Sequence, residues 1–373
     1  MHVKIVDIVL IVLFVQIISL LPYLLVQRWK NLPNRFLALF LLAKALCISN
    51  FLCFRLMPVS LEYVPHLFFI GSSFTILWGP LLYFYTRSLS EQDFSFSKYH
   101  LLHFIPFLLH LSYFTINFHW HSAEVKRALI TSGTFPGADL SRIIFVGIHG
   151  TIFLYTLVSF WLVWKYRIFL KDHFSKLGGI RLSWLVFVIC GFSIKWGFDM
   201  WYAFENLTGG NWGSVALGLS RLTLFLFINI MIYFGLNQSP VLVESINEIK
   251  DSKRSLSDDL LDKYAARLSS YMDLHKPYLE PDITLIQLSD MVRIPPRSLS
   301  EVLNKALGKN FYDFINSYRI KESKRLLAEH SAASVTVLEI LYRVGYNSKS
   351  SFNAAFKKHV GMTPSQYKSQ ISV

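Results

Sequence analysis

Charged residues are scarce in this sequence, and that scarcity restricts the class of protein that it encodes. Only 16% of the 373 residues are Asp, Glu, Lys or Arg, whereas soluble globular proteins carry about 25%. Apolar residues make up 53% of the chain, and its mean hydropathy is +0.39. The composition does not fit an ordinary soluble protein and favours a membrane protein.

Cysteine and catalytic signatures are also lacking. The three cysteines, Cys47, Cys53 and Cys190, form no C-x-x-C pair and all lie in apolar stretches. This argues against a disulfide framework or a structural zinc site and favours packing as small apolar residues. The sequence contains no Walker loop, no H-E-x-x-H, no G-x-S-x-G and no histidine-kinase or cyclase signature. We therefore expect no enzyme activity, no cofactor and no metal.

Seven stretches are long and apolar enough to cross a bilayer as helices, which takes about 20 residues for a core of about 30 Å. The predicted spans are residues 5–27, 36–57, 64–86, 100–120, 143–164, 183–204 and 213–236. The connecting loops are short, so the sequence offers no separate sensor domain outside the membrane. Any signal is expected to enter through the spans, the loops or a partner.

Positive charge is unequal on the two sides of the predicted spans, which indicates the orientation of the chain. The loops at 28–35, 87–99 and 165–182 carry ten Lys and Arg residues together, against five on the opposite side. The richer side is expected to be cytoplasmic, so the N-terminus lies outside and residues 237–373 lie in the cytoplasm. The expected location is the bacterial cytoplasmic (inner) membrane, crossed several times.

Charge and polarity also divide the chain into parts. Residues 1–236 are predicted to form a seven-helix transmembrane domain, 237–257 a cytoplasmic linker, and 258–373 a separate domain. Residues 285–373 hold 13 Lys and Arg against 6 Asp and Glu, a net charge of +7. Such a basic domain suits a polyanionic partner. The expected fold class is all-α throughout, a polytopic helix bundle followed by a helical C-terminal domain.

Helical periodicity in the C-terminal domain predicts a first helix-turn-helix unit. A helix at 258–275 precedes a short helix at 284–292, a turn, and a second helix that starts near Pro296. From Leu299 to Leu307 the apolar residues of this second helix recur at i, i+3, i+4, i+7 and i+8. Its other face carries short polar and basic side chains that suit a major groove. The predicted DNA contacts there are Arg297, Ser298, Ser300, Glu301, Asn304 and Lys305.

The same arrangement recurs after a long helix at 311–329. A helix at 335–344 precedes Gly345, which suits a left-handed residue at a turn, and a second reading helix follows at about 348–359. The DNA contacts predicted for this helix are Ser348, Lys349, Ser351, Asn353 and Lys357. Two such units in one domain predict sequence-specific binding to double-stranded DNA.

Residues from about 258 to 370 resemble the DNA-binding domain of the AraC/XylS transcriptional regulators. The resemblance is carried by the runs ILYRVGYNSKSSF at 340–352 and FKKHVGMTPSQY at 356–367. It implies two helix-turn-helix subdomains joined by the long helix, with their second helices in successive major-groove segments. The chain departs from the usual family residues at four positions, where it has Arg293 for Gly, Pro295 for Ser, Leu303 for Phe and Ala354 for Arg.

Charged residues inside the predicted spans are candidates for a signal site, because charge within a bilayer is costly. Lys195 and Asp199 are i, i+4 neighbours in span six, and Arg221 in span seven lies at a depth similar to that of Lys195. We expect these three to form a polar cluster that borders a ligand pocket or a switch; a static ion pair is the alternative. Lys44 in span two is expected to extend its ammonium group toward the cytoplasmic interface.

The membrane half resembles the membrane-tethered subgroup of AraC-type regulators, at residues 79–85 and 103–107, together with 276–279. The expected function is a membrane-bound, DNA-binding transcription regulator, a one-component signalling protein controlled by a signal perceived in or at the membrane. Its expected partners are double-stranded promoter DNA, the lipid bilayer, RNA polymerase, a second copy of the chain, and an unknown small ligand or membrane partner.

The alternative function is a seven-helix receptor or transporter-like sensor whose tail acts mainly through protein–protein contact. A retinal-type receptor would need a lysine in the seventh span, and residues 213–236 contain none. A transporter is disfavoured because the sequence shows no internal repeat and no broken helices in matched halves.

Overall fold

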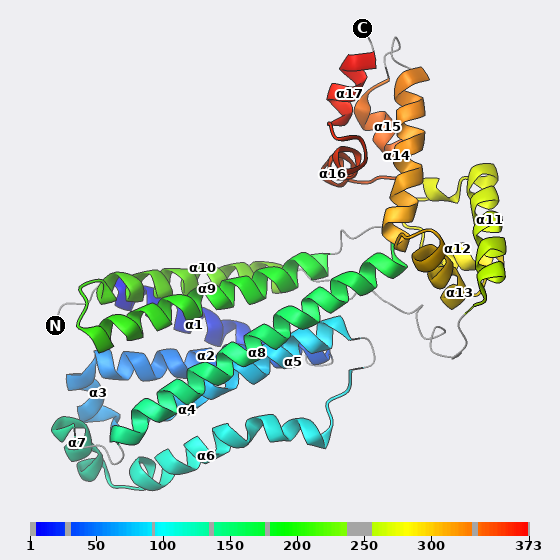
Figure 1. Ribbon diagram of the computed structural model, residues 1–373. Helices are drawn as coiled ribbons and strands as arrows, with labels where there is room; N and C mark the ends of the chain where they lie inside the picture. Colours follow the sequence, from blue (N-terminus) through cyan, green and yellow to red (C-terminus); the bar gives the residue numbers. More distant parts are fainter. Residues whose placement is uncertain are drawn as a thin grey trace. The chain divides into compact units, whose positions relative to one another are not determined.

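The computed structural model describes residues 5–26, 31–91, 94–133, 138–175, 180–236, 256–329 and 335–371. Apart from its last two residues, the predicted linker at 237–257 lies outside the described residues. The described part of the chain is helical and contains no β-strand, which confirms the all-α class. The chain forms two compact units, residues 1–164 with 181–239 and residues 165–180 with 240–373 (Figure 1).

The first unit is built mainly of long helices that run along a common direction (Figure 1). They are α1 (Ile5–Val26), α2 (Leu32–Arg55), α3 (Met57–Tyr63), α4 (Ile70–Phe74), α5 (Trp78–Ser90), α6 (Ile105–Phe114), α7 (Ala123–Ser132), α8 (Ala138–His173), α9 (Ile180–Thr208) and α10 (Gly213–Leu236). Seven helical stretches among the described residues are long and apolar enough to cross a membrane, and each overlaps a predicted span.

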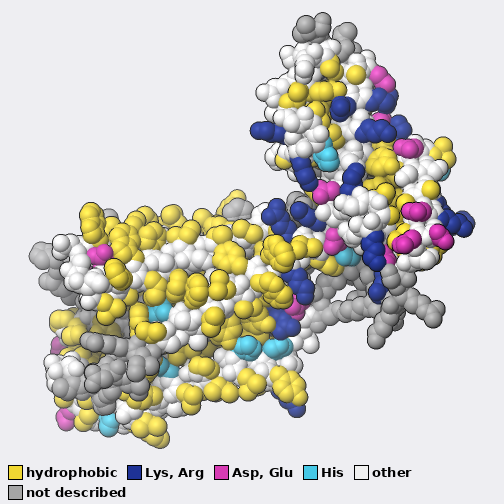
Figure 2. All heavy atoms as spheres, viewed as in Figure 1, with side chains coloured by type: hydrophobic (Ala, Val, Ile, Leu, Met, Phe, Trp, Pro, Cys, Tyr) yellow, Lys and Arg dark blue, Asp and Glu magenta, His cyan; other side chains and the backbone are white. Residues whose placement is uncertain are grey.

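Helix α2 packs against α1, α4 and α5. At Gly71 the backbone of α4 approaches α2 so closely that a Cβ atom there would lie 2.0 Å from the carbonyl oxygen of Leu46. Small residues at such contacts let membrane helices pack by van der Waals contact. The visible flank of the bundle is covered mostly by hydrophobic side chains, as Figure 2 shows.

The third and fourth spans are interrupted rather than continuous α-helices. In the third, α4 passes through a 3₁₀ turn, η2 (Thr75–Leu77), into α5, and the 3₁₀ segment η1 (Pro65–Leu67) precedes α4. In the fourth, η3 (Lys98–Phe104) leads into α6 and a π-helical turn, η4 (Thr115–His119), follows. Pro80 and Pro106 lie in the first turns of α5 and α6. A proline ring donates no backbone hydrogen bond, which favours a break at those positions.

The second unit consists of helices that pack around α14. They are α11 (Asp258–His275), η6 (Pro277–Leu279), α12 (Leu285–Val292), α13 (Pro296–Glu301), η7 (Val302–Ala306), α14 (Phe311–Glu329), α15 (Val337–Arg343), α16 (Lys349–Val360) and α17 (Pro364–Ile371). Two hydrophobic cores form on α14, one with α11 to α13 and one with α15 to α17. Leu279 packs against both cores and so links the two subdomains.

Two apolar residues that the periodicity assigns to the core are exposed. Ala306 faces solvent because η7 is a π-helical turn, in which Leu307 N donates to Val302 O at 3.1 Å. The wider turn rotates the following side chains away from the face that 3.6-residue spacing predicts. Leu338 is 50% exposed, because α15 turns Ile340 and Leu341 inward instead.

Candidate functional site

The first helix-turn-helix unit consists of α12, a three-residue turn and α13. Thr284 and Gln287 form a capping box at the start of α12. The backbone N–H of Gln287 donates to Thr284 Oγ1 at 3.3 Å, and the backbone N–H of Thr284 donates to Gln287 Oε1 at 2.9 Å. Arg293 forms the turn with φ of 52°, a left-handed conformation that glycine adopts without steric cost. Pro296 then occupies the first position of α13, where its fixed φ suits a helix start.

The predicted reading face of the first unit is reached by solvent, with one exception. Arg297, Asn304 and Lys305 are exposed, and Ser298 and Ser300 are half-buried. These side chains share the outer side of α13 and η7, opposite the buried Leu299 and Leu303.

Glu301 is the exception, because its side chain is 14% exposed. Its Oε1 accepts a hydrogen bond from Lys305 Nζ at 2.7 Å and lies 3.3 Å from the backbone nitrogen of Leu256. The Glu301 carboxylate is therefore hydrogen-bonded within the protein, and it connects Leu256, which precedes α11, to the first reading helix.

The second unit consists of α15, the turn at Gly345, and α16. Gly345 has φ of 84°, and a Cβ atom there would lie 2.7 Å from Leu279 O, so both the conformation and the space require glycine. Ser348 begins α16 and accepts a weak hydrogen bond from Ser351 N at 3.5 Å, which makes it the N-cap.

Three of the predicted contacts on α16, Lys349, Asn353 and Lys357, recur every four residues and share one side of the helix. Lys349 and Lys357 are exposed, whereas Ser351 and Asn353 are half-buried. Beside them, sequence reasoning omitted Asn347 and Ser350, which are exposed at the same end of the helix. The polar run Asn347–Ser351 was visible in the sequence and could have indicated both.

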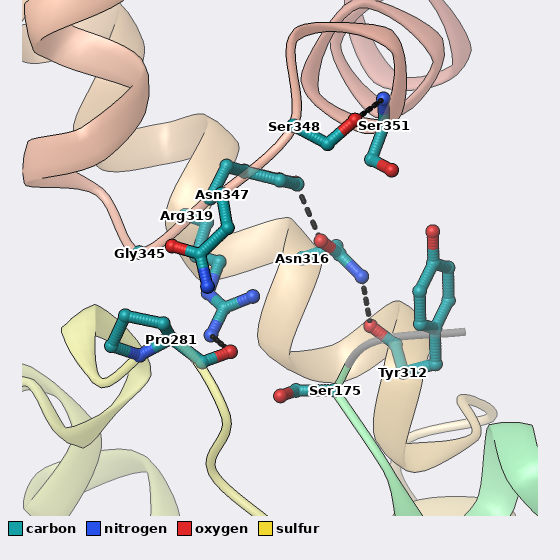
Figure 3. A pocket seen from close by; sticks show the side chains of 10 residues that line it. Ser175, Pro281, Tyr312, Asn316, Arg319, Gly345, Asn347, Ser348 and Ser351 are labelled. Atoms are coloured by element: carbon teal, nitrogen blue, oxygen red, sulfur yellow. Dashed lines mark hydrogen bonds between the residues drawn. The ribbon is translucent and has the colours of Figure 1, made fainter. Parts of the chain in front are cut away.

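The two subdomains are joined by polar side chains of α14 that are almost fully buried (Figure 3). Arg319 is 1% exposed, and it donates from Nε to Tyr278 O at 2.7 Å and from Nη2 to Glu280 O at 2.6 Å. Asn316, also 1% exposed, accepts from Tyr346 Oη at 2.5 Å. Burial raises the pKa of Tyr346, so its hydroxyl stays protonated and acts as a donor. Sequence periodicity missed these residues because it assigns polar side chains to the surface.

A second polar contact joins the long helix to the second reading helix. Lys358 on α16 donates to Asp313 on α14 at 2.6 Å. Burial acts to raise the pKa of Asp313, but the Lys358 hydrogen bond and charge outweigh it and hold that pKa below its usual value. Lys358 is therefore a link between helices as well as a positive charge on the surface.

The bundle of the first unit contains a cavity of about 870 Å³. It is lined by residues of α2, α8, α9 and α10 and of the interrupted third span. The apolar lining residues are Phe51, Trp78, Phe145, Val146, Ala203, Leu207 and Leu217, and the polar ones are Thr75, His149, Asp199, Tyr202 and Asn206. A few polar groups in a mostly apolar concave wall are typical of small-molecule sites.

The three charged residues singled out in spans six and seven lie at or near this cavity. Lys195 forms an ion pair with Asp199, and Ser220 Oγ donates to the other carboxylate oxygen of Asp199 at 2.5 Å. The guanidinium carbon of Arg221 lies 4.0 Å from the ring centroid of Phe51. The structure thus pairs Lys195 with Asp199 and directs Arg221 onto an aromatic wall of the same cavity.

Lys44 does not reach the membrane interface, so that sequence prediction is wrong. The residue is 2% exposed, and its Nζ lies 3.0 Å from the ring centroid of Trp78 and 5.4 Å from those of Phe40 and Phe192. Among the described residues, Lys44 Nζ has no hydrogen-bond partner. Aromatic faces from three helices hold this ammonium inside the bundle by cation–π contact, an arrangement that one span alone could not indicate.

Comparison with known proteins identifies the C-terminal domain. Residues 288–370 match the helix-turn-helix domain family of AraC type. The chain is 26% identical over 153 residues to the uncharacterized HTH-type transcriptional regulator YtdP of Bacillus subtilis, covering 37% of this chain and 19% of that protein. It is 28% identical over 128 residues to an uncharacterized HTH-type transcriptional regulator of Staphylococcus aureus strain COL, covering 34% and 16%.

One solved structure is also similar, the C-terminal domain of AraT, a response regulator from Geobacillus stearothermophilus. Its identity is 27%, its TM-score is 0.27, and the match covers 30% of this chain and 89% of that one. The match to the two curated relatives spans less than a fifth of their length. The family match shows that the C-terminal region of this chain contains an AraC-type helix-turn-helix domain, a class of domain that reads double-stranded DNA.

Proposed function

We propose that this chain is a membrane-bound transcription regulator that binds promoter DNA through both helix-turn-helix units. The observation that carries the proposal is the presence, in one chain, of an AraC-type domain and seven helices long and apolar enough to cross a membrane. A DNA reader that is covalently attached to a bilayer can convert an event in the membrane into a change at a promoter without a diffusible messenger.

The proposed DNA contacts differ in role according to their chemistry. Arg297, Lys349 and Lys357 are exposed cations that suit phosphates or guanine edges, and Asn304 and Asn353 suit adenine edges. The buried contacts of Arg319 and Asn316 support a fixed spacing between the two reading helices. A fixed spacing favours binding to two major-groove segments about one helical turn apart.

Membrane orientation follows from the charge of the loops. The proposed arrangement places the N-terminus outside the cytoplasmic membrane and the DNA-binding domain inside. Within the bundle, Lys195, Asp199 and Arg221 with the adjoining cavity form the proposed signal site. RNA polymerase and a second copy of the chain are further proposed partners.

DNA binding is tested with the full chain in lipid nanodiscs. Genomic fragments retained by the protein are sequenced. The affinity for the fragment that binds most tightly is then measured by fluorescence anisotropy between about 50 and 200 mM salt. Over this range, proteins that make 6–10 phosphate contacts lose about 10³- to 10⁵-fold in affinity. Lys349→Ala is expected to weaken binding to all sequences and to reduce the salt slope by about 1. Lys263→Ala, an exposed lysine on α11 that belongs to neither reading helix, is the matched control. No preference for any sequence at any salt concentration would refute the proposal.

The role of the membrane is tested separately in cells. A specific protease site inserted at 240–257 allows the DNA-binding domain to be released from the bundle on demand. We expect release to change expression of the target genes. If the transcriptome after cleavage matches that of the uncleaved protein, the bundle exerts no control.

A further inference from the structure

We propose that the cavity of the bundle binds an amphipathic anion, a molecule with an apolar body and a carboxylate or phosphate head. The regulatory consequence of this binding rests on the proposed function, but the binding itself does not. The cavity volume of about 870 Å³ lies in the range of small-molecule sites, about 300–1,000 Å³. Its mostly apolar lining, which is open to the outside of the bundle at Val146 and Leu207, would contact the body of the ligand.

Formal charge around the cavity is unbalanced in favour of cations. Lys195 is neutralised by Asp199, and Arg55 pairs with Asp7 at 3.0 Å. Arg221 also lies in the field of Asp7, so two guanidinium groups share that one carboxylate. Lys44 adds a further lysine, whose Nζ has no hydrogen-bond partner among the described residues. An unbalanced charge inside a bilayer is unfavourable, and an anionic ligand would compensate it.

The surplus cations lie against aromatic residues that line the cavity. Lys44 Nζ lies 3.0 Å from the ring centroid of Trp78, and the Arg221 guanidinium carbon lies 4.0 Å from that of Phe51. Both rings belong to the cavity wall. The anionic head is therefore expected to lie near Trp78 and Phe51, within the field of both cations.

Hydrogen-bond donors in the wall point to the same class of ligand. Trp196 Nε1 donates to His149 Nδ1 at 3.2 Å, and an indole N–H can only donate, so the proton of the neutral His149 ring is on Nε2. The Nε2–H group of His149 and the hydroxyl group of Tyr202 can each donate a hydrogen bond to an anionic oxygen.

A cationic ligand fits less well, although aromatic walls often select cations. Asp199 is the one charged residue in the lining, and both of its oxygens are already engaged, by Lys195 and by Ser220. The face of Trp78 is already occupied by Lys44, and Lys195 Nζ lies 4.8 Å from the same ring centroid. A second cation would meet repulsion from both lysines.

The test compares three probes with the same 12-carbon chain. The full protein is placed in nanodiscs of uncharged phosphatidylcholine, and equilibrium binding of dodecanoate, dodecanol and dodecyltrimethylammonium is measured without DNA. We expect dodecanoate to bind at least tenfold more tightly than either other probe. Equal binding of dodecanoate and dodecanol, or preferred binding of the cation, would overturn the proposal.

Variants place the binding in the cavity. Ala203 lines the cavity, so Ala203→Trp is expected to narrow it and weaken dodecanoate binding. Lys44→Met keeps the side-chain length, removes one surplus cation and is expected to erase most of the preference for dodecanoate over dodecanol. Lys126→Met is a control for the loss of a buried lysine, because Lys126 is equally buried at 2% exposure but lies in α7, where its Nζ donates to His119 O at 2.8 Å. Wild-type affinity in Ala203→Trp, with folding verified by thermal unfolding, would overturn the proposal.

Two further arms identify the source of the head group and separate this proposal from the proposed function. Nanodiscs that contain phosphatidylglycerol compete with dodecanoate if a membrane lipid is the natural ligand, and leave its binding unchanged if a free amphiphile is. DNA affinity is then measured with and without dodecanoate. If dodecanoate binds but does not change the DNA affinity, signal control through the cavity is contradicted and the ligand assignment stands. If the protein binds DNA but not dodecanoate, the ligand assignment alone is contradicted.

Discussion

Replacing Arg319 with methionine should destabilise both helix-turn-helix subdomains, although the residue touches neither reading helix's outer face. Its guanidinium donates to the carbonyls of Tyr278, Glu280 and Pro281 at 2.7, 2.6 and 3.1 Å. Methionine fills most of the volume but donates nothing. Leaving buried acceptors unpaired costs about 1–3 kcal/mol each, so with partial relaxation we expect a loss of about 3–5 kcal/mol.

Hydrogen exchange with mass spectrometry on the full chain in nanodiscs measures this loss. The opening free energy of peptides from 276–284, 311–329 and 345–352 should fall together, because Arg319 contacts the first segment from the second and supports Gly345 at the third. Arg319→Lys should recover only part of the protection, since a single ammonium lacks the planar fork that reaches several carbonyls. Arg267→Met on the exposed side of α11 is the control. A loss below about 1 kcal/mol in Arg319→Met would mean that water satisfies the carbonyls and would refute the reasoning.

Three other substitutions give further tests. Arg293→Gly should stabilise the first unit by about 0.5–1 kcal/mol and raise its melting temperature, because φ of 52° strains every residue except glycine; unchanged or lower stability would contradict this. Asn353→Ala should cost about 1–3 kcal/mol in affinity for the preferred DNA and little for mismatched DNA, measured by anisotropy; an equal loss on both would assign Asn353 to the backbone. The Arg325 hydrogen bond holds the pKa of Glu322 below its usual value, so this residue stabilises the fold above the unfolded pKa of about 4.3. That contribution should disappear as pH falls through the folded pKa, and Glu322→Gln should flatten the pH dependence of thermal unfolding.

The long helices of the C-terminal domain could be predicted closely from the sequence. Periodicity and the turn residues predicted helices at 258–275 and at about 311–329. The structure has α11 and α14 with these bounds. Each has a recurring apolar stripe, so local information was sufficient. The seven apolar spans followed from length and hydropathy for the same reason.

Other features depended on contacts that a single helix does not reveal. The π-helical turn at 302–306 exposes Ala306, and no spacing rule anticipates an inserted residue in a helix. Arg319 and Asn316 look like surface residues of α14 until the 276–284 segment and Tyr346 cover them. The DNA contacts proposed on each reading helix stay a prediction. The hydrogen bonds that Leu256 and Lys305 donate to Glu301 could not be anticipated from the helix alone.

Arg319 and Lys44 are both buried cations, yet their surroundings lead to opposite expectations for the same substitution. Arg319 is hydrogen-bonded to three carbonyls, so its loss leaves polar groups unpaired. Lys44 rests on aromatic rings without a hydrogen-bond acceptor among the described residues, so its loss leaves nothing unpaired. Replacing a poorly compensated buried charge with an apolar residue is often neutral or stabilising by about 1–4 kcal/mol.

Lys44→Met should therefore leave the thermal stability of the bundle unchanged or raise it when no anionic amphiphile is present. Thermal unfolding in phosphatidylcholine nanodiscs, followed by tryptophan fluorescence, measures this. Adding dodecanoate should stabilise the wild type more than the variant, because a ligand stabilises the folded state in proportion to how tightly it binds it. A strong destabilisation of Lys44→Met without ligand would instead make Lys44 a structural element of the bundle, held there by its cation–π contacts alone.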